Sequence, residues 1–253
     1  SRYEATAHET LDQNVYNAAA FGAAHADGSG STSGTLLFRA DNPFLSAGSR
    51  RILAENGITS FQLSRSSRDL SMNNASTDTE LTRLVAGVAG HLEAGGRGFS
   101  WEASVTHGRG DFDYLGTGLI QQNFINALNV TTDAGGTIIC DPNAPGTLAD
   151  PHCRPLNLFG ENQASADALA YVSTPTRASA RTRQTVLNAS VSGGLFDLPG
   201  GPLSFAAGLE HRREEGAFTP DPYQRLGQGR SVPVQAASGA YHTNEVFAEV
   251  LAP

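Results

Sequence analysis

Two cysteines, Cys140 and Cys153, are the residues of this chain whose types and spacing are best suited to chemistry. They stand in a stretch rich in Pro, Gly and Asp, with 12 residues between them. Together with His152 and Asp150 they would offer thiolate, imidazole and carboxylate ligands to a zinc ion. Structural zinc sites usually take four Cys or His ligands, however, whereas two cysteines form one disulfide with none left over. We therefore expect a Cys140–Cys153 disulfide, with a zinc site as the alternative.

Arginine supplies all 17 basic residues of the chain. A guanidinium group holds a carboxylate or phosphate of a ligand through paired hydrogen bonds, so arginines near the ends or on the inner face of predicted strands are candidate ligand contacts. The candidates are Arg65, Arg68, Arg177, Arg181, Arg212 and Arg213, and Arg83 and Arg183 lie in comparable positions. The favoured alternative is that these arginines pair with neighbouring carboxylates such as Glu102 and Glu210.

Signals for catalysis or cofactor binding are absent from the sequence. There is no G-x-S-x-G elbow, P-loop, H-E-x-x-H pair or dinucleotide fingerprint. The seven histidines are scattered, with no pair at metal-ligand spacing. The formal net charge of -8, without a clustered basic face, argues against a nucleic-acid partner. We expect neither an enzyme nor a cofactor-binding protein.

Alternation of apolar and polar residues is the clearest structural signal. Two stretches, LTRLVAGVAGHL–EAGGRG–FSWEASVTH and TVLNASVSGGLF–DLPGGP–LSFAAGLEH, each contain two alternating runs on either side of a Gly-rich turn of about six residues. Such a pattern is typical of a β-hairpin. With the runs at the two ends of the chain, it predicts six long strands, near residues 1–12, 79–92, 98–110, 181–196, 202–216 and 240–252.

The segments between these strands, 13–78, 111–180 and 217–239, are long and polar. Loops of this length are uncommon in compact domains, whereas outer-membrane barrels combine short periplasmic turns with long extracellular loops. If both Gly-rich turns are periplasmic, all three long loops fall on the other side. The sequence therefore favours an all-β protein, an antiparallel transmembrane β-barrel segment with short helices in its loops. A soluble β-sandwich is the alternative, because alternation does not distinguish lipid from a second sheet.

Several blocks occur in an order that resembles the barrel region of TonB-dependent outer-membrane receptors. CRPLNLFG is followed by the helix-like SADALAYV, in which Ser165 is the expected N-cap, and then by TVLNASVSGGLFDLPGGPLSFAAGLEHRREE and NEVFAEVLAP. Upstream, ADNPFLSAGSRRIL, FQLSRSSRDL and TRLVAGVAGHL with FSWEASVTHGRGD are similar to the same family. The resemblance covers most of residues 38–253 and is most specific in PLNLFG, an expected apolar anchor of its loop, and in GPLSFAAGLEHR.

The resemblance implies that residues 1–253 are part of one plugged barrel of about 22 strands. Such receptors import scarce solutes, such as siderophores, cobalamin or saccharides, with energy from the inner-membrane TonB complex. No plug or TonB-contacting segment is recognisable in this sequence, so we expect a piece of a longer chain, surrounded by outer-membrane lipid of a Gram-negative type of cell. The alternatives are a passive porin or adhesin barrel and a soluble secreted β-sandwich that binds a partner.

Overall fold

The computed structural model describes residues 2–10, 36–63, 69–70, 74–228 and 233–253. Strands dominate, and the long ones pair antiparallel in one sheet in the order β1-β4-β5-β8-β9-β10. Their bounds are β1 (Arg2–Thr10), β4 (Asn74–Ala94), β5 (Arg97–Leu119), β8 (Ser173–Leu198), β9 (Gly201–Thr219) and β10 (Ala237–Leu251). The predicted all-β, antiparallel character is confirmed. Residues 1, 11 and 12 of the first predicted strand lie outside the described residues.

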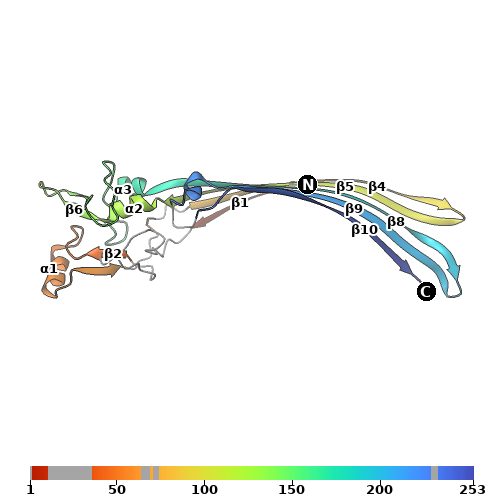
Figure 1. Cartoon of the computed structure of the whole chain (residues 1–253), viewed down its shortest axis with the longest axis horizontal. Helices are drawn as coiled ribbons and strands as arrows, with labels where there is room; N and C mark the ends of the chain where they lie inside the picture. Colours follow the sequence, from red (N-terminus) through yellow and green to blue (C-terminus); the bar gives the residue numbers. More distant parts are fainter. Residues whose placement is uncertain (1, 11–35, 64–68, 71–73, 229–232) are drawn as a thin grey trace.

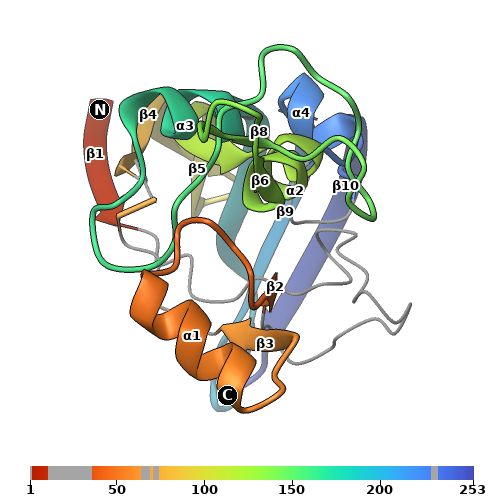
Figure 2. The same cartoon turned by 90° about the vertical axis from the view of Figure 1, so that its left-hand side faces the viewer.

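The sheet is open in the part of the chain that the structure describes. β1 and β10 are its two edges and do not pair with each other. Figure 1 shows the strands running side by side along the long axis and bending together, and Figure 2 shows an arch with a convex and a concave side. The described residues therefore form a curved antiparallel sheet and no closed barrel.

The two Gly-rich segments reverse the chain within two residues each. β4 and β5 are joined by Gly95 and Gly96, whose φ angles of +59° and +72° lie in the left-handed region that glycine enters without steric penalty. β8 and β9 likewise pair up to a two-residue turn. Between the two hairpin ends, Arg97 Nη2 donates to Asp197 Oδ2 at 2.9 Å. The turns are thus shorter than the six residues predicted, because the strands continue almost to the glycines.

β4, β5 and β8 extend well beyond their predicted bounds and contain 21, 23 and 26 residues. The segments 111–119 and 173–180, predicted as loop, pair with each other and continue β5 and β8. They lack a continuous apolar face, so alternation does not mark them as strand. At about 3.3 Å per residue these strands are roughly 70–85 Å long, more than twice the thickness of a hydrocarbon core of about 30 Å.

The helices and short strands of the described chain gather at the end opposite to the turns (Figure 1). They are β2 (Leu36–Arg39), α1 (Ala47–Glu55), β3 (Ser60–Leu63), α2 (Gln121–Leu128), β6 (Val130–Thr132), β7 (Ile138–Cys140), α3 (Ala166–Val172) and α4 (Pro222–Arg225). We call residues 36–63 and 120–172 together the loop module. Figure 2 shows α1, β2 and β3 below the arch, on its concave side. Short turns and long loops therefore lie at opposite ends, as predicted.

The predicted short helix in SADALAYV is confirmed as α3. Its N-cap is Ser165, whose Oγ accepts a hydrogen bond from the backbone N–H of Ala168 at 3.1 Å. This bond satisfies one of the amide groups that a helix leaves unpaired at its N-terminus. None of the helices among the described residues is long and apolar enough to cross a membrane.

The buried apolar core lies in the loop module and at the adjoining strand ends, while the long sheet has none of its own. The core joins the two parts of the module, and PLNLFG supplies two of its members, in keeping with the expected anchor. Its buried side chains are Leu36, Phe38, Leu70, Leu119, Phe124, Ala127, Leu156, Leu158, Ala168 and Val172. The apolar side chains of the sheet therefore remain exposed along most of its length.

Candidate functional site

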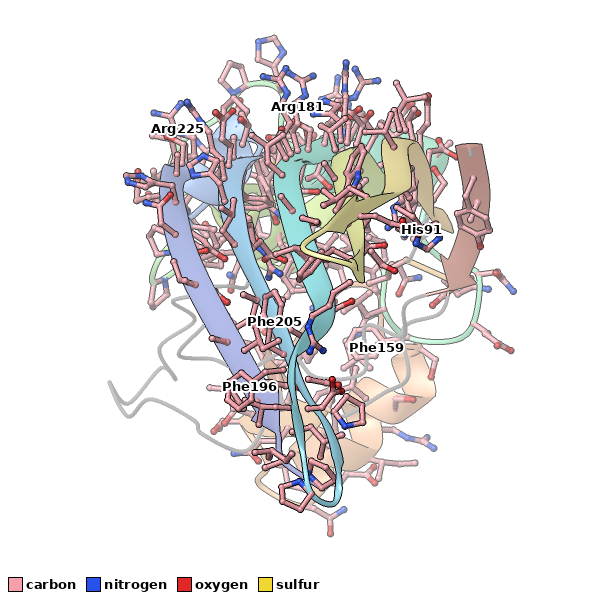
Figure 3. All side chains as sticks on the ribbon, turned by 90° about the vertical axis from the view of Figure 1, so that its right-hand side faces the viewer. His91, Phe159, Arg181, Phe196, Phe205 and Arg225 are labelled. Atoms are coloured by element: carbon pink, nitrogen blue, oxygen red, sulfur yellow. A yellow bond between two sulfur atoms is a disulfide. The ribbon has the colours of Figure 1, made fainter. Side chains whose placement is uncertain are left out.

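The side on which Arg181 lies is enough to assign the residues of the long strands to one or the other face of the sheet. Figure 3 shows Arg181 above the arch, on its convex side, and His91 below it, on its concave side. Side chains alternate across a strand, so residues an even number of positions from Arg181 along β8 share the convex face. Residues paired directly across the sheet point to the same side. The register thus gives the face of the residues of β4, β5, β8, β9 and β10, up to the irregularity between Gly194 and Phe196.

A band of apolar side chains crosses the convex face of five strands. Its middle row pairs Val88, Ala103, Ala189, Leu209 and Val246 across the sheet. Val88 is 63% exposed and Val246 is 86% exposed. The other members are Leu84, Ala86 and Leu92 of β4, Phe99, Trp101 and Val105 of β5, Leu187 and Val191 of β8, Phe205 and Ala207 of β9, and Ala248 and Val250 of β10. We call these residues the apolar band.

The concave face at the same level is mostly polar, with Val85, Val186 and Phe247 as the large apolar exceptions. It carries Ser100, Glu102, Ser104 and Thr106 of β5, Asn188, Ser190 and Ser192 of β8, Glu210 and Arg212 of β9, and Thr243 and Glu245 of β10. Farther from the turns, Glu214 accepts hydrogen bonds from Gln184 Nε2 at 2.8 Å and from the hydroxyl of Tyr241 at 2.6 Å. Such a wall suits an interior filled by water or polar protein.

The disulfide and a hydrogen-bond network fix the longer loop of the module. Cys140 and Cys153 are joined by a disulfide. Beside it, Asp150 Oδ2 accepts a hydrogen bond from the hydroxyl of Tyr171 at 2.8 Å. Asn126, which is buried, donates through Nδ2 to the same hydroxyl at 3.2 Å and accepts through Oδ1 from the N–H of Leu148 at 2.9 Å. These bonds tie the loop between α2 and α3 to both helices.

Loss of the disulfide is expected to loosen this loop. In the chain-entropy model, a closed loop of this size stabilises by about 3 kcal/mol, so Cys140→Ala with Cys153→Ala should lower the free energy of local unfolding by that order. The measurement is the rate of proteolytic cleavage within residues 129–152 of the intact protein as a function of urea. Wild-type protein treated with a thiol reductant is the matched control and should behave like the double variant. An unchanged cleavage rate in both would contradict the expectation.

The same loop should also respond to acid. The backbone N–H of His152 and the hydroxyl of Tyr171 donate to Asp150 and hold the pKa of its carboxyl below the usual range. A lowered folded-state pKa stabilises the fold above the unfolded-state value of about 4, and this stabilisation is lost as the pH falls through the folded-state pKa. We expect protease resistance of the loop to fall below about pH 4, and Asp150→Asn to flatten this dependence. A pH profile shared by both proteins would contradict the assignment to Asp150.

The six candidate arginines do not form one site. Arg65 and Arg68 lie outside the described residues. Arg212 lies on the concave face and pairs with Glu210 at 2.7 Å, as the alternative interpretation predicted. The three others share the face of the apolar band: Arg177, Arg181 and Arg213. The parity of each residue along its strand thus places the last three on the convex side of the sheet, and a ligand contact by any of the six arginines stays a prediction.

The described residues offer no metal centre. No group of three or more His, Cys, Asp or Glu side chains within them is arranged to hold a metal ion, and both thiols are used in the disulfide. A hollow of about 620 Å³ lies between α1 and the β2–β3 hairpin. Its cationic groups already have partners, since Arg39 is bound to Asp41 and Arg50 Nη1 donates to the carbonyl of Pro43 at 3.2 Å.

Comparison with known proteins adds no relative to these observations. No protein-family model, no curated protein and no solved structure matches the chain.

Proposed function

We propose that this chain forms part of the wall of an outer-membrane receptor for TonB-energised uptake of a scarce solute. The observation that carries the proposal is the exposed apolar band on one face of a sheet whose opposite face is polar. In water such a band would be unfavourable, whereas lipid covers it without cost. Outer-membrane barrels have this arrangement, with an apolar outer face and a polar interior.

The dimensions of the apolar band support the membrane assignment. From Phe99 to Val105, and from Leu84 to Leu92, it spans roughly 20–26 Å along the strands at about 3.3 Å per residue. This is of the order of the apolar belt of outer-membrane barrels, about 25 Å. The turns lie on one side of the band, and the loop module lies well beyond its other side. With periplasmic turns, the loop module is extracellular.

The large accessible surface of the chain also supports a sheet that is covered by lipid and by further strands. It amounts to 15236 Å², whereas a compact monomer of 26.5 kDa exposes about 10,700 Å². In the proposed assembly, lipid covers the apolar band, and further strands pair with the open edges of β1 and β10. Those further strands are not among the described residues, in which β1 and β10 remain the edges of the sheet.

A soluble β-sandwich accounts less well for these features. It requires a second sheet over the apolar face, but the other described sheets contain two short strands each and belong to the loop module. The loop module further favours a receptor over a passive pore, because α1, β2 and β3 lie below the concave face (Figure 2), a position that would narrow the mouth of the proposed barrel. The family resemblance of the sequence adds the TonB complex as the energy source.

Uptake by cells that carry the intact protein tests the proposal. Strains with and without a working TonB complex would receive labelled ferric siderophore, cyanocobalamin or maltodextrin at limiting concentration. We expect accumulation of one class of solute, only when both the protein and the TonB complex are present. Uptake that persists without the TonB complex would support the passive porin instead. Absence of the protein from the outer-membrane fraction would overturn the membrane assignment itself.

A further inference from the structure

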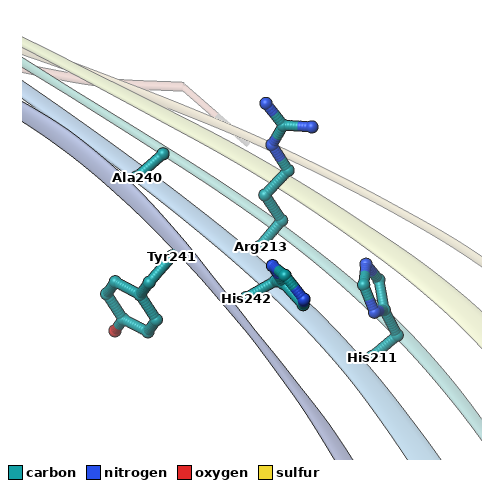
Figure 4. A pocket seen from close by; sticks show the side chains of 5 residues that line it. All are labelled: His211, Arg213, Ala240, Tyr241 and His242. Carbon is teal, nitrogen blue, oxygen red and sulfur yellow. The ribbon is translucent and has the colours of Figure 1, made fainter.

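Basic side chains gather on the convex face directly beyond the apolar band. Along β8 and β9 the apolar residues give way to arginine, and on β10 the register sets His242 opposite Arg213. Figure 4 shows Arg213 and His211 on one side of the strands and Tyr241 on the other. We call the following residues the arginine shelf: Arg181, Arg183, His211, Arg213 and His242.

The arginine shelf surrounds two adjoining shallow hollows of about 370 Å³ and 360 Å³. They exist because the convex face carries small residues between the basic ones, namely Ala217, Ser238 and Ala240. Long cationic side chains thus stand around a floor of small side chains. This leaves room for a group the size of a lipid headgroup without any change in the strands.

The carboxylates nearest to the shelf are fewer than its cations. Glu215 is shared, at 2.7 Å from Arg213 Nη2 and 3.9 Å from Arg183 Nη1. Arg181 Nε donates to Asp111 at 2.8 Å, and Asp111 is also bound by Arg109. Four arginines therefore meet two carboxylates in these pairs. The remaining convex carboxylates of this region lie towards the other side of the sheet, on β4 and β5: Asp78, Glu80 and Asp113.

We infer that the arginine shelf binds the phosphate of a phosphorylated membrane lipid whose acyl chains lie against the apolar band. The inference rests on the proposed function, because it requires the apolar band to face lipid. Arginine forks match the geometry of phosphate oxygens, and basic residues next to a membrane attract anionic headgroups. A free phosphate ion would gain nothing from Leu187, Leu209 and Val246, which continue the surface of the shelf towards the membrane centre. The carboxylates of β4 and β5 disfavour an anion there and confine the site to β8–β10.

A tryptophan reporter beside the shelf would test the inference in the intact protein. Val246 is exposed, lies on the convex face and is four residues from His242, so Val246→Trp places the reporter on the lipid side. The protein is reconstituted in bilayers that contain brominated phosphatidic acid or brominated phosphatidylcholine, and the quenching is compared with that of Val246→Phe. Trp101, at the turn side of the apolar band, serves as the distant reporter.

Each basic residue near an anionic membrane surface contributes about fivefold to binding. Because Arg183 and Arg213 share Glu215, this pair carries one net positive charge, and we expect the Val246→Trp reporter to show roughly a fivefold preference for phosphatidic acid. Replacing all three shelf arginines, Arg181→Gln, Arg183→Gln and Arg213→Gln, should remove it. The matched control removes three arginines from helices and loops: Arg51→Gln, Arg154→Gln and Arg225→Gln. This control should keep the preference, and Trp101 should show none in any variant.

Each contrary result has a distinct meaning. Equal quenching of the reporter by both lipids, with Trp101 also quenched, overturns the lipid site and leaves the membrane wall intact. A preference abolished by an equal concentration of inorganic phosphate overturns the assignment to lipid in favour of the free ion. A reporter shielded from both lipids in a dimeric protein overturns it in favour of a second copy. Absence of quenching at both positions overturns the proposed function as well.

Discussion

Phe124→Ala is expected to lower the free energy of unfolding of the loop module by about 3–5 kcal/mol. Phe124, in α2, is 0% exposed and belongs to the buried cluster that joins both parts of the module. Its removal leaves a cavity in this cluster, whose members include Leu36 and Phe38 of the first part and Leu156 and Leu158 of the second. Large-to-small changes of this kind cost the lost transfer free energy and the cavity together. This is the largest effect that we expect in the loop module.

Hydrogen–deuterium exchange of the intact protein measures this change, because amides of α2 and α3 exchange through opening of the module. Leu148→Ala is the matched control, since Leu148 lies in the same loop but is exposed, and its replacement should change exchange little. The amides of the long sheet should keep their protection in both variants. Equal effects of the two substitutions would contradict a single core shared by the two parts of the module.

Val88→Arg is expected to destabilise the membrane-inserted protein by about 2–4 kcal/mol, the cost of an arginine at the lipid-facing centre of a barrel. Val88 lies in the middle row of the apolar band and is exposed in the sheet. Reversible urea unfolding in phospholipid vesicles gives the free energy. The loss should shrink for positions nearer to either end of the band.

The neighbouring residue provides the control for that experiment. Ala89 points to the concave face and is paired directly with Glu102. An arginine at position 89 would meet water and this carboxylate, so Ala89→Arg should cost little. If Val88→Arg and Ala89→Arg proved equally harmless, or if the second were the worse, the assignment of the faces would be wrong.

Alternation predicted the half of the sheet next to the turns, because there one face must be apolar and the other polar. The register pairs the apolar residues expected on one face with one another, from Val88 through Ala189 to Val246. Leu195 is an exception, since the register shifts between Gly194 and Phe196. Beyond the apolar band, alternation continues only briefly, in DFDY (111–114), and then ends among Gly, Ser, Thr and Pro residues, so residues 111–119 and 173–180 were predicted as loop.

In the loop module, local sequence patterns predict caps and the disulfide but not the packing contacts between distant segments. Ser165 and the two cysteines were identified from residue type and spacing, because an N-cap and a disulfide depend on few atoms. The rings of Phe38 and Phe159 pack with their centroids 5.0 Å apart and join segments about 120 residues apart in the chain, and no local pattern predicts such a contact. The sequence therefore predicted that PLNLFG anchors its loop, but not the residues against which it packs.

The arginine shelf could have been found from the sequence by parity. Arg181 and Arg183 lie an even number of positions from Leu187, and Arg213 lies an even number from Leu209. On regular strands these residues must share the face of the apolar band. Nearness to strand ends does not distinguish the two faces of a strand. Arg212 and Arg213 were therefore treated alike, although neighbouring residues of a strand point to opposite sides.

In the proposed receptor, the convex face of the sheet contacts lipid and the concave face does not. Nitroxide labels placed singly at residues 186 to 191 of β8, in the intact protein in lipid vesicles, measure it directly through collision with oxygen and with a water-soluble nickel complex. We expect opposite alternation of the two signals, with oxygen highest at Leu187, Ala189 and Val191 and nickel highest at Val186, Asn188 and Ser190. High nickel accessibility at Leu187, Ala189 and Val191 would contradict it.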